Sequence, residues 1–429
     1  MSLQFLYKQT EIGSIPKKWE VITLRDVVEN DDDIVAGPFG SNLKVSDYIE
    51  NGIPIIRLQN IERNEFIHKD IKFVSNKKAD ELKYHSFRAG DIVLAKLGDP
   101  IGKACMVPSS LERGIVVADA VRIRVSPKKA LAYFIEYILN SPICTLQLQK
   151  ETIGTTRPRV NIFQIRNLII PLPPIPEQKK IAEILSSVDQ VIEKVNEAIE
   201  KTQRLKKGLM QELLTKGIGH KEFKDTGIGR IPKEWVVWKL GEIADLERGK
   251  FAFRPRNDPR FYGGKYPFIQ TGDINEANGI IKKYLQTLNE EGLKISKMFK
   301  KGTIVISIAG NIGDVGILDF DSCFPDSIVG IKGDSEKASN LFLMYLLQKF
   351  KRELDSIAPR STQKNINLEI LEAFKLPLPS PSEQEKIAEI LSGVDERLEL
   401  LRRRNERLEK IKRGLMNDLL TGKERVKLN

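Results

Sequence analysis

Four loops of this chain are rich in side chains that contact nucleic acids. They occupy residues 36–44, 154–161, 248–257 and 360–367, where arginine or lysine accompanies turn-forming and amide residues. Arginine and lysine can contact phosphates or guanine, and asparagine and glutamine suit adenine. As sets the loops favour DNA recognition, whereas for any single residue a solvated loop is the alternative interpretation. The predicted DNA-binding residues are Lys44, Arg57, Gln59, Asn60, Thr156, Arg157, Arg159, Arg248, Lys250, Arg254, Arg256, Gln270, Arg360, Thr362, Gln363 and Lys364.

Motifs of catalysis are missing from the sequence. Residues 98–103, Gly-Asp-Pro-Ile-Gly-Lys, resemble a phosphate-binding loop, but the glycine spacing is one residue short and Ala104 replaces the Ser or Thr. No Gly-x-Gly-x-x-Gly follows a predicted strand, and neither Asn-Pro-Pro-Tyr nor Asp-Pro-Pro-Tyr, the amino-methyltransferase signature, occurs. We therefore expect a protein that is not an enzyme and that holds no cofactor of its own.

Cysteine and histidine are too scattered to form a disulfide framework or a metal site, and no His-Glu-x-x-His motif occurs. We expect ordinary core or surface roles for these six residues. They are Cys105, Cys144, Cys323, His68, His85 and His220.

The composition is that of a folded, basic protein. A length of 429 residues suggests two to four domains. The 69 Lys and Arg against 58 Asp and Glu leave a net charge of +11, which hints at a polyanionic partner. No apolar run approaches the roughly 20 residues of a membrane helix, and the N-terminus lacks the pattern of a signal peptide. We therefore expect a cytoplasmic protein.

The chain is a tandem duplication. Residues 10–19 recur as 226–235, an offset of 216, and residues 177–186 recur as 383–392, an offset of 206. The stretches between these markers share only short turns and strand cores. Two variable globular units therefore alternate with two similar connecting units.

The variable units are predicted to be mixed α/β modules, because short runs rich in β-branched residues are followed in each by a helical pattern. The expected strands are 53–58, 91–97, 115–125, 302–308 and 315–320, and the expected helices are 131–146 and 340–357.

The connecting units are predicted to be long helices. Each opens with a proline cluster, which suits the first turn of a helix but not its interior. Apolar residues then recur every three or four positions, and this seam continues for three to four heptads. The predicted seam residues are Ile181, Leu185, Val188, Ile192, Val195, Ile199, Ile387, Leu391, Val394, Leu398, Leu401 and Leu408.

Two such seams can pack on each other, which we favour, or each can lie on its own globular unit. Asn405 interrupts the second seam, and it either fixes the register or faces solvent. The basic run in 402–413 either tracks phosphates or is a solvated helix face. A helix of about 38 residues spans nearly 60 Å, which compares with one to two turns of DNA.

These features together resemble the specificity subunit of type I restriction-modification systems over essentially the whole chain. The resemblance rests on Ile-Pro-x-x-Trp at 15–19 and 231–235 and on Glu-Gln-x-x-Ile-Ala-Glu-Ile-Leu at 177–185 and 383–391. A polar turn carries Thr362-Gln363 in the second copy, where the family often has Thr-Gln. The first copy has Thr156-Arg157 instead, so the two turns need not act identically.

The resemblance implies an α+β fold with two mixed α/β target recognition domains separated by two long antiparallel helices that form a coiled coil. It also implies that the internal duplication has pseudo-two-fold symmetry. Its expected division is 1–174 for the first recognition domain, 175–216 for the first helix, 217–380 for the second domain, and 381–429 for the second helix and tail.

By the same resemblance, each recognition domain reads one half of a bipartite asymmetric site in double-stranded DNA. The paired helices set the gap and dock two methyltransferase subunits, which restriction subunits join. S-adenosylmethionine, ATP and Mg are expected in those partners. The alternatives are a coiled-coil scaffold that reads no DNA and a self-sufficient DNA methyltransferase.

Overall fold

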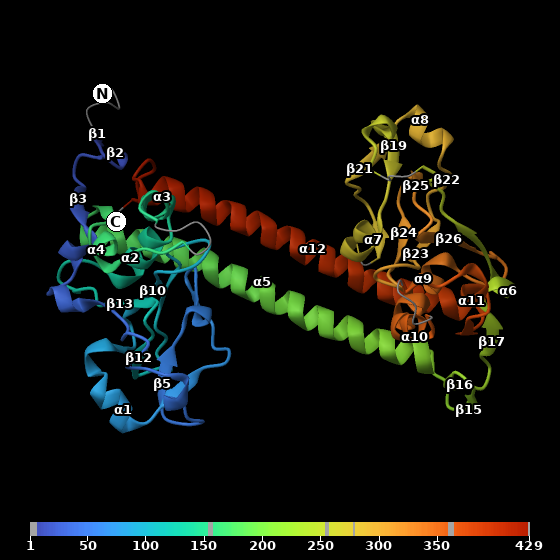
Figure 1. The fold of residues 1–429 in the computed structure, drawn as a ribbon, viewed down its shortest axis with the longest axis horizontal. Coiled ribbons are helices and arrows are strands. Elements are labelled where there is room, and N and C mark those ends of the chain that lie inside the picture. The colour runs from blue at the N-terminus through green and yellow to red at the C-terminus, as the bar shows by residue number, and fades with distance from the viewer. Residues whose placement is uncertain (1–6, 153–157, 254–256, 278, 359–363, 428–429) are drawn as a thin grey trace. The chain divides into compact units, whose positions relative to one another are not determined.

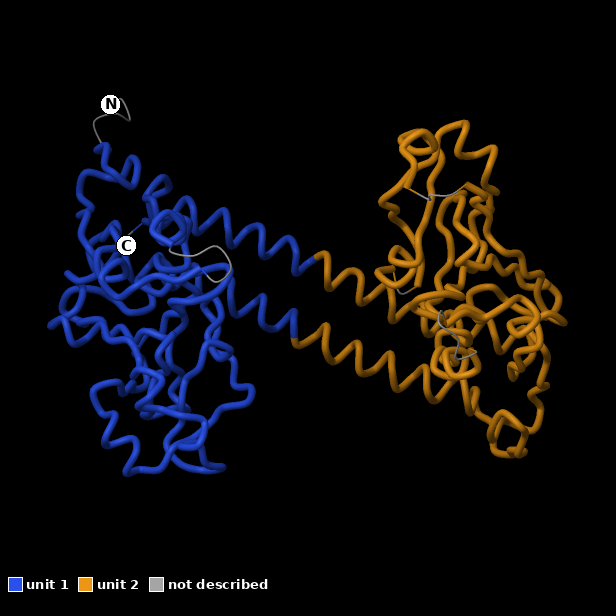
Figure 2. Tube along the Cα trace, viewed as in Figure 1, with its two compact units in different colours: residues 1–196, 404–429 blue, residues 197–403 orange. Residues whose placement is uncertain are grey.

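The computed structural model describes residues 7–152, 158–253, 257–277, 279–358 and 364–427. The chain divides into two compact units (Figure 2). Unit 1 comprises Met1–Asn196 and Arg404–Asn429, and unit 2 comprises Glu197–Arg403. Each unit therefore contains one variable module, the first half of one long helix and the second half of the other.

Unit 1 is built from short strands and short helices ahead of the first long helix (Figure 1). Its strands are β1 (Tyr7–Thr10), β2 (Gly13–Pro16), β3 (Glu20–Thr23), β4 (Ile34–Ala36), β5 (Ile53–Ile56), β6 (Ile61–Glu62), β7 (Glu65–Phe66), β8 (Lys72–Val74), β9 (Ser86–Arg88), β10 (Ile92–Ala95), β11 (Ala104–Met106), β12 (Arg113–Val116), β13 (Ala120–Ile123) and β14 (Ile169–Leu172). Its helices before the long one are α1 (Asn76–Glu81), α2 (Ala132–Leu139), α3 (Pro142–Lys150) and α4 (Ile162–Arg166).

Two four-stranded sheets organise unit 1, with strand orders β11-β10-β13-β4 and β8-β5-β12-β9. All four residues of β10 are buried, as a strand with apolar neighbours on both faces requires. The main core lies between the first sheet and the helices, and it includes Trp19, Leu94 and Phe134. This core holds the sheet that positions the loops described below.

Unit 2 repeats this plan with different strand lengths. Its strands are β15 (Phe223–Thr226), β16 (Gly229–Pro232), β17 (Val236–Lys239), β18 (Ala244–Arg248), β19 (Tyr262–Phe268), β20 (Ile280–Ile281), β21 (Gln286–Leu288), β22 (Met298–Phe299), β23 (Ile304–Ser307), β24 (Val315–Leu318), β25 (Ser322–Cys323), β26 (Ile328–Gly333) and β27 (Lys375–Leu378). Its short helices are α6 (Leu240–Ile243), α7 (Thr271–Ala277), α8 (Glu290–Lys294), α9 (Asn340–Lys349), α10 (Lys351–Ile357) and α11 (Leu368–Glu372).

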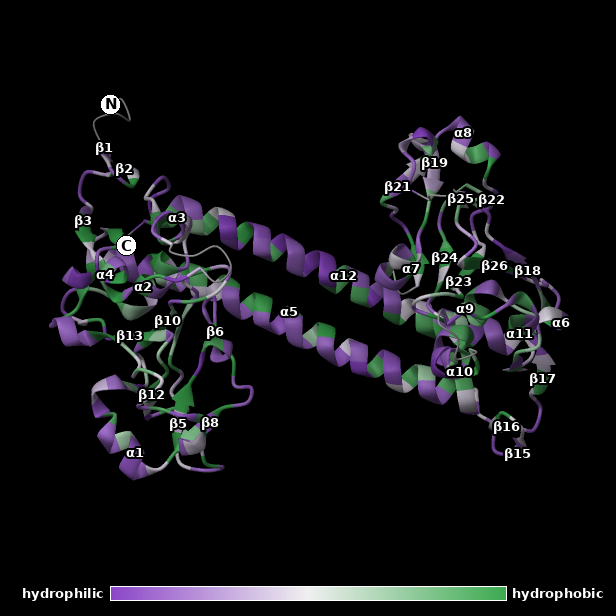
Figure 3. Ribbon diagram, viewed as in Figure 1, coloured by the Kyte–Doolittle hydropathy of each residue, from purple (hydrophilic) through white to green (hydrophobic). Residues whose placement is uncertain are grey.

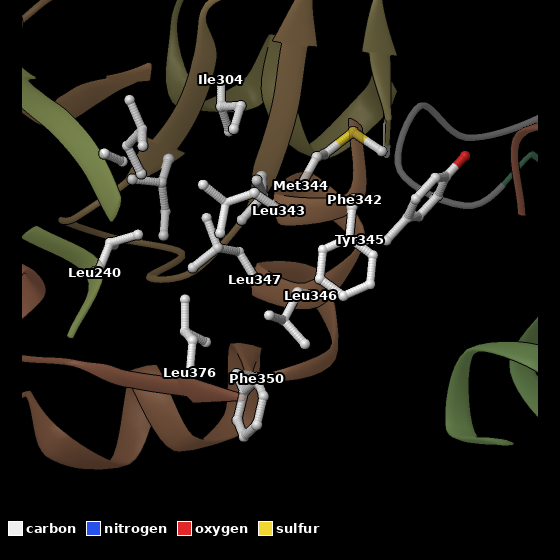
Figure 4. Close-up of a cluster of buried hydrophobic side chains, with 14 of the residues drawn as sticks. Leu240, Ile304, Phe342, Leu343, Met344, Tyr345, Leu346, Leu347, Phe350 and Leu376 are labelled. Carbon is white, nitrogen blue, oxygen red and sulfur yellow. The ribbon is translucent and has the colours of Figure 1, made fainter. Parts of the chain in front are cut away.

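The sheets of unit 2 have strand orders β18-β26-β23-β24-β20 and β21-β19-β25-β22. Helix α9 packs on β24 and β26 through side chains that the close-up in Figure 4 gathers around Leu343 and Leu347. Tyr345 stands at the margin of this cluster with its hydroxyl directed away from it (Figure 4).

The sequence prediction needs correction at three elements. The run 115–125 is not one strand, because residues 117–119 separate the end of β12 from β13, and these two strands belong to different sheets. The helix expected at 131–146 is divided into α2 and α3, because Pro142 starts a new helix at its N1 position. The helix expected at 340–357 is divided at Phe350 into α9 and α10.

The two long helices are α5 (Ile175–Lys216) and α12 (Pro381–Leu420), of 42 and 40 residues. They confirm the predicted fold class of mixed α/β modules joined by long helices. Both helices are largely polar, with apolar residues at intervals along them (Figure 3). At 1.5 Å per residue each spans about 60 Å.

One ion pair joins the two long helices within each unit. In unit 1, Lys412 Nζ lies 2.6 Å from Asp189 Oδ1, and in unit 2, Lys206 Nζ lies 2.6 Å from Asp395 Oδ1. The partners are 17 residues apart on each helix (206 − 189 and 412 − 395), and they run in opposite directions. The helices are therefore antiparallel in each unit.

Eight of the twelve predicted seam residues are buried, and the other four are partly exposed. The first seam residues of each helix lie in the globular core of one unit, which is the second of the two packing modes considered. Ile181 and Leu185 belong to the globular core of unit 1, together with Leu419 and Leu420 at the end of α12. Ile387 and Leu391 belong in the same way to the core of unit 2, together with Leu213 and Leu214 at the end of α5. The buried residues are Ile181, Leu185, Ile192, Val195, Ile387, Leu391, Leu398 and Leu401, and the partly exposed ones are Val188, Ile199, Val394 and Leu408.

Asn405 is partly buried in unit 1. Its Oδ1 atom is enclosed and has no hydrogen-bond partner among the described residues. The carboxamide oxygen of Asn405 therefore does not face solvent, which contradicts the solvent-facing alternative for this atom.

Candidate nucleic-acid interface

The loops of unit 1 meet at one edge of the sheet β11-β10-β13-β4. Strands β4 and β10 end there, and β11 and β13 begin there, because Ala36 pairs beside Val121, Ala95 faces Ala120, and Leu94 faces Ala104. Loops 37–44, 96–103 and 117–119 therefore leave the sheet on the same side. We call these loops, with residues 158–161, the unit 1 loop edge.

The described part of the polar turn of unit 1, residues 158–161, is bonded to this edge through backbone hydrogen bonds. Val160 N donates to Lys96 O at 3.0 Å, and Gly98 N donates to Pro158 O at 3.2 Å. Arg159 lies between these contacts, and its Nη2 atom donates to Asp119 Oδ1 at 3.0 Å. The predicted residue Arg159 thus stands on the loop edge, more than half exposed.

Unit 2 builds an equivalent edge. Strands β18 and β23 end at Arg248 and Ser307, which lie beside the start of β26, and β24 begins opposite the end of β23. The polar turn is fastened there too, because Ile366 N donates to Ile308 O at 3.0 Å. We call the described parts of 249–258, 308–314, 325–327 and 364–367 the unit 2 loop edge.

A glycine begins the first loop at both edges, for the same physical reason. A Cβ atom on Gly37 would lie 2.1 Å from the carbonyl carbon of Val117, and one on Gly249 would lie 2.4 Å from Pro325 O. These glycines also donate from their backbone nitrogens, Gly37 to Ala120 O at 3.0 Å and Gly249 to Ile328 O at 2.9 Å. Close backbone approach therefore aims the first loop in the same way in both units.

Gln59 joins the unit 1 edge through a shallow pocket of about 170 Å³, which it lines with Leu97 and the loop residues Gly98 to Pro100. Its Nε2 atom donates to Asp70 Oδ2 at 3.1 Å, and Arg57 Nη2 donates to the same oxygen at 2.8 Å. Hydrogen bonds from Lys72, Arg57 and Gln59 lower the pKa of Asp70, so this carboxylate stays charged. Arg57 and Gln59 are thus held in place by one carboxylate beside the loop edge.

Asn60 has a structural role in this conformation. Its side chain is fully buried, Oδ1 accepts from Arg57 N at 3.0 Å, and Nδ2 donates to Ile67 O at 2.9 Å and Lys69 O at 3.0 Å. No donor of the amide is left to face a base edge. In the sequence, an asparagine that is buried for structural reasons looks the same as one that contacts DNA.

The remaining described candidates are exposed or partly exposed. Lys44 lies in the first loop of unit 1. Arg248 Nε donates to Asp326 O at 2.6 Å on the unit 2 edge, and Lys250 follows in the same loop. Gln270 Nε2 donates to Gln286 Oε1 at 3.1 Å, and Lys364 Nζ lies 2.7 Å from Asp355 Oδ2. The other predicted residues lie outside the described ones: Thr156, Arg157, Arg254, Arg256, Arg360, Thr362 and Gln363.

Lys96 is a member of the unit 1 edge that the sequence did not indicate. It is half-buried between Asp119 and Arg159, and burial lowers the pKa of Lys96 while the Asp119 carboxylate opposes that shift. In the sequence, a single lysine at the end of a hydrophobic strand does not indicate a DNA-binding residue. Only the pairing of the polar turn with this strand end shows that Lys96 and Arg159 are neighbours.

The repeated Trp and Glu-Gln motifs join each module to the start of a long helix. Trp19 Nε1 donates to Glu177 Oε2 at 3.0 Å, and in unit 2 Trp235 Nε1 donates to Glu383 Oε2 at 3.3 Å. The neighbouring glutamine then caps another helix of the module. Gln178 Oε1 accepts from Leu131 N at 2.9 Å, just before α2.

In each unit, a tyrosine of the module bonds to an aspartate of one long helix, and this aspartate bonds to a lysine of the other long helix. This Tyr-Asp-Lys set occurs in both units. Tyr137 Oη donates to Asp189 Oδ2 at 2.6 Å, and Asp189 also binds Lys412. In unit 2, Tyr345 Oη donates to Asp395 Oδ2 at 2.8 Å, and Asp395 binds Lys206, whose ammonium also lies 5.6 Å from the Tyr345 ring centre. Burial raises the pKa of both tyrosines, so both stay protonated donors.

Comparison with known proteins identifies the family. A model of the type I restriction modification DNA specificity domain matches residues 16–201 and 232–410. The chain belongs to this family. A protein of Methanocaldococcus jannaschii assigned as the type I restriction enzyme MjaX specificity subunit is 32% identical over 427 residues, which cover 98% of this chain and 97% of the relative. The MjaVIII specificity subunit of the same organism is 31% identical over 439 residues, with 98% and 96% covered.

Solved structures share the fold. The S subunit of a type I restriction-modification system from M. genitalium has a TM-score of 0.60 at 15% identity, covering 96% of this chain and 97% of its own. A chain from a study of assembly and conformational transition of the type I R-M system has a TM-score of 0.58 at 18% identity, with 96% and 99% covered. This protein is a type I specificity subunit, and the scaffold and self-sufficient methyltransferase alternatives are not favoured.

Two kinds of feature are absent from the residues that the structure describes. No helix among them combines the length and apolar character needed to cross a membrane. Likewise, no group of three or more Cys, His, Asp or Glu side chains in the described ranges is placed to hold a metal ion.

Proposed function

We propose that each loop edge of this specificity subunit reads one half of a bipartite, asymmetric site in double-stranded DNA. One observation carries the proposal: in both units the same sheet edge gathers the first loop and the polar turn. The described basic and amide side chains on or beside these edges include Lys44, Gln59, Lys96, Arg159, Arg248, Lys250 and Lys364. Such side chains contact phosphates and base edges.

The differences between the two edges support an asymmetric site. Arg159 is paired with Asp119 on unit 1, whereas Asn365 occupies the equivalent position on unit 2, at the duplication offset of 206. Loops that differ in donors and acceptors prefer different bases. The two halves of the DNA site should therefore differ in sequence.

The long helices have two proposed tasks: they set the length of the unread gap, and they dock two methyltransferase subunits. Restriction subunits then join that assembly. Catalysis of methylation and cleavage resides in these partners, and so do S-adenosylmethionine, ATP and Mg. The Tyr-Asp-Lys contacts bond the module of each unit to its long helices. They support a fixed length of the gap, because a module that is bonded to its helix moves with it.

An exchange of residues 20–170 for the corresponding module of another specificity subunit tests the proposal. The chimaera is combined with its methyltransferase partner, and methylated adenines are mapped across a genome. One half of the methylated site should change while the other half and the gap stay the same. A change in both halves, or in neither, would contradict independent reading by the two units.

A further inference from the structure

The first loop of unit 1 displays a phenylalanine to solvent. Phe39 is 83% exposed, which makes it the most exposed phenylalanine among the residues that the structure describes. Phenylalanine is usually buried, because transfer of its ring out of water is favourable. The place of Phe39 on the unit 1 loop edge therefore calls for an explanation.

The backbone on both sides of Phe39 is held in place. Gly37 N donates to Ala120 O at 3.0 Å at the base of the loop, and Pro38 is buried. Beyond the ring, Asn42 N donates to Phe39 O at 2.8 Å and closes a turn. The loop thus presents the ring at a defined position on the edge.

The equivalent phenylalanine of unit 2 lies in the interior. Phe251 follows Gly249 by two positions, as Phe39 follows Gly37, and both pairs have an offset of 212 (251 − 39 and 249 − 37). Phe251 is only 2% exposed, and its ring centre lies 5.2 Å from that of Phe268. A packing role therefore accounts for Phe251, whereas Phe39 has its ring in water.

Cationic side chains share the loop edge with Phe39. Lys44 follows in the same loop, and Lys96 and Arg159 lie on the neighbouring loops, where Arg159 also binds Asp119. These charges suit the phosphates of DNA. Groove edges and phosphates are mostly polar, so a duplex offers an apolar ring two kinds of surface: the methyl groups of thymine and the faces of its stacked bases.

We propose that Phe39 inserts between two neighbouring base pairs of the half-site read by unit 1 and unstacks them, and that unit 2 has no such wedge at the equivalent Phe251. The inference rests on the proposed function and adds how one half-site is deformed. An inserted side chain kinks the duplex, and the cost of a kink depends on the base step. Phe39 therefore contributes specificity through the deformability of the DNA, in addition to direct contacts with bases.

A series of nicked duplexes tests the proposal on the full-length chain in complex with its methyltransferase subunit. The duplexes carry the methylated site mapped for the wild type, and the half read by unit 1 is the half that changes when residues 20–170 are exchanged. One nick, with its 5′-phosphate retained, is placed at each step of this half in turn. A nick eases a kink at one step and keeps every base and phosphate.

The variants are Phe39→Ala, Phe39→Trp and a matched control, Leu285→Ala, which truncates an 85% exposed apolar side chain outside both loop edges. Phe39→Ala should bind the intact site roughly tenfold to hundredfold more weakly, as expected for the loss of one stacked aromatic contact. A nick at one particular step should strengthen wild-type binding but not binding by Phe39→Ala. Phe39→Trp and Leu285→Ala should behave as the wild type, and all variants should melt at the wild-type temperature.

Two results would overturn the inference while leaving the proposed function intact. One is Phe39→Ala binding the intact site at wild-type affinity. The other is a nick series in which no step strengthens wild-type binding more than binding by Phe39→Ala. If replacement of a thymine by uracil then reproduces the loss, Phe39 contacts a methyl group instead. A wild-type complex with no preference for the mapped site would refute the proposed function itself.

Discussion

At the residue scale, Glu136 on α2 is a carboxyl group in an apolar interior. It is 5% exposed, and its Oε1 atom accepts from Met106 N at 3.0 Å. Burial raises the pKa of Glu136 from 4.5 to about 7, the Met106 N–H opposes this shift, and the nearby Asp189 adds to it. The folded chain therefore binds this proton more readily than the unfolded chain does.

The stability that Glu136 contributes is complete below about pH 4.5 and is lost as the pH rises through about 7. We expect Glu136→Gln to be more stable than the wild type at pH 8, by up to about 3 kcal/mol, and to differ little at pH 4.5. Urea unfolding at several pH values measures this. Glu112→Gln, an exposed carboxylate in the same unit, should leave the pH profile unchanged. A parallel profile for Glu136→Gln and wild type would show that the carboxyl is solvated.

Single residues also show where sequence reasoning stops. Asn60 and Arg159 are both polar residues in predicted DNA-facing stretches, yet one is fully buried and the other is exposed on the loop edge. The difference depends on the strand pairing of distant segments. The polar turn was predictable because it recurs at the duplication offset, whereas Lys96 was not, because its partner Asp119 is distant in sequence.

At the element scale, the long helices were predictable because their periodicity is local and continues for several heptads. The split of 131–146 was predictable in principle from Pro142, since proline at N1 begins a helix. The tyrosine–aspartate hydrogen bonds that join the modules to the long helices were not predictable. Tyr137 and Tyr345 look like core aromatics in sequence, and only tertiary packing brings their hydroxyls to Asp189 and Asp395.

The contribution of each tyrosine–aspartate hydrogen bond to stability can be measured separately. Tyr137→Phe and Tyr345→Phe each remove a hydrogen bond to a partly buried carboxylate, and we expect a loss of about 1.5–3 kcal/mol in the stability of the unit concerned. Hydrogen exchange of each unit measures the local effect. Tyr133→Phe, on the same helix as Tyr137 but 60% exposed, is the control. Equal small effects for Tyr133 and Tyr137 would show that the hydroxyl contact adds nothing.

At the scale of the whole molecule, the proposed gap-setting role makes a length prediction. Deleting residues 194–200 and 400–406 removes seven residues from each helix between its two ion-pairing positions. The helices shorten by about 10 Å, and the unread gap in the methylated DNA site should shrink by up to about three base pairs. Both half-sites should be unchanged. Mapping of methylated adenines with the variant measures the gap, and an unaltered gap would refute the role.

The single deletion in either helix is the control for this experiment. It would leave the ion-pairing positions 17 residues apart on one helix and ten residues apart on the other. The two ion pairs could not then both form in straight helices. We expect such variants to be less stable than the double deletion, which keeps the spacing equal.

Each ion pair between the long helices takes its carboxylate from one copy of the duplication and its ammonium from the other. A reversal of charge at Asp189 can thus be repaired at Lys412, 223 positions away, and not at Lys206, which lies closer in sequence. A substitution at one of these four positions therefore removes an ion pair unless its partner in the other repeat changes as well. Substitutions there should be inherited as matched changes across the halves, even while the modules between them diverge.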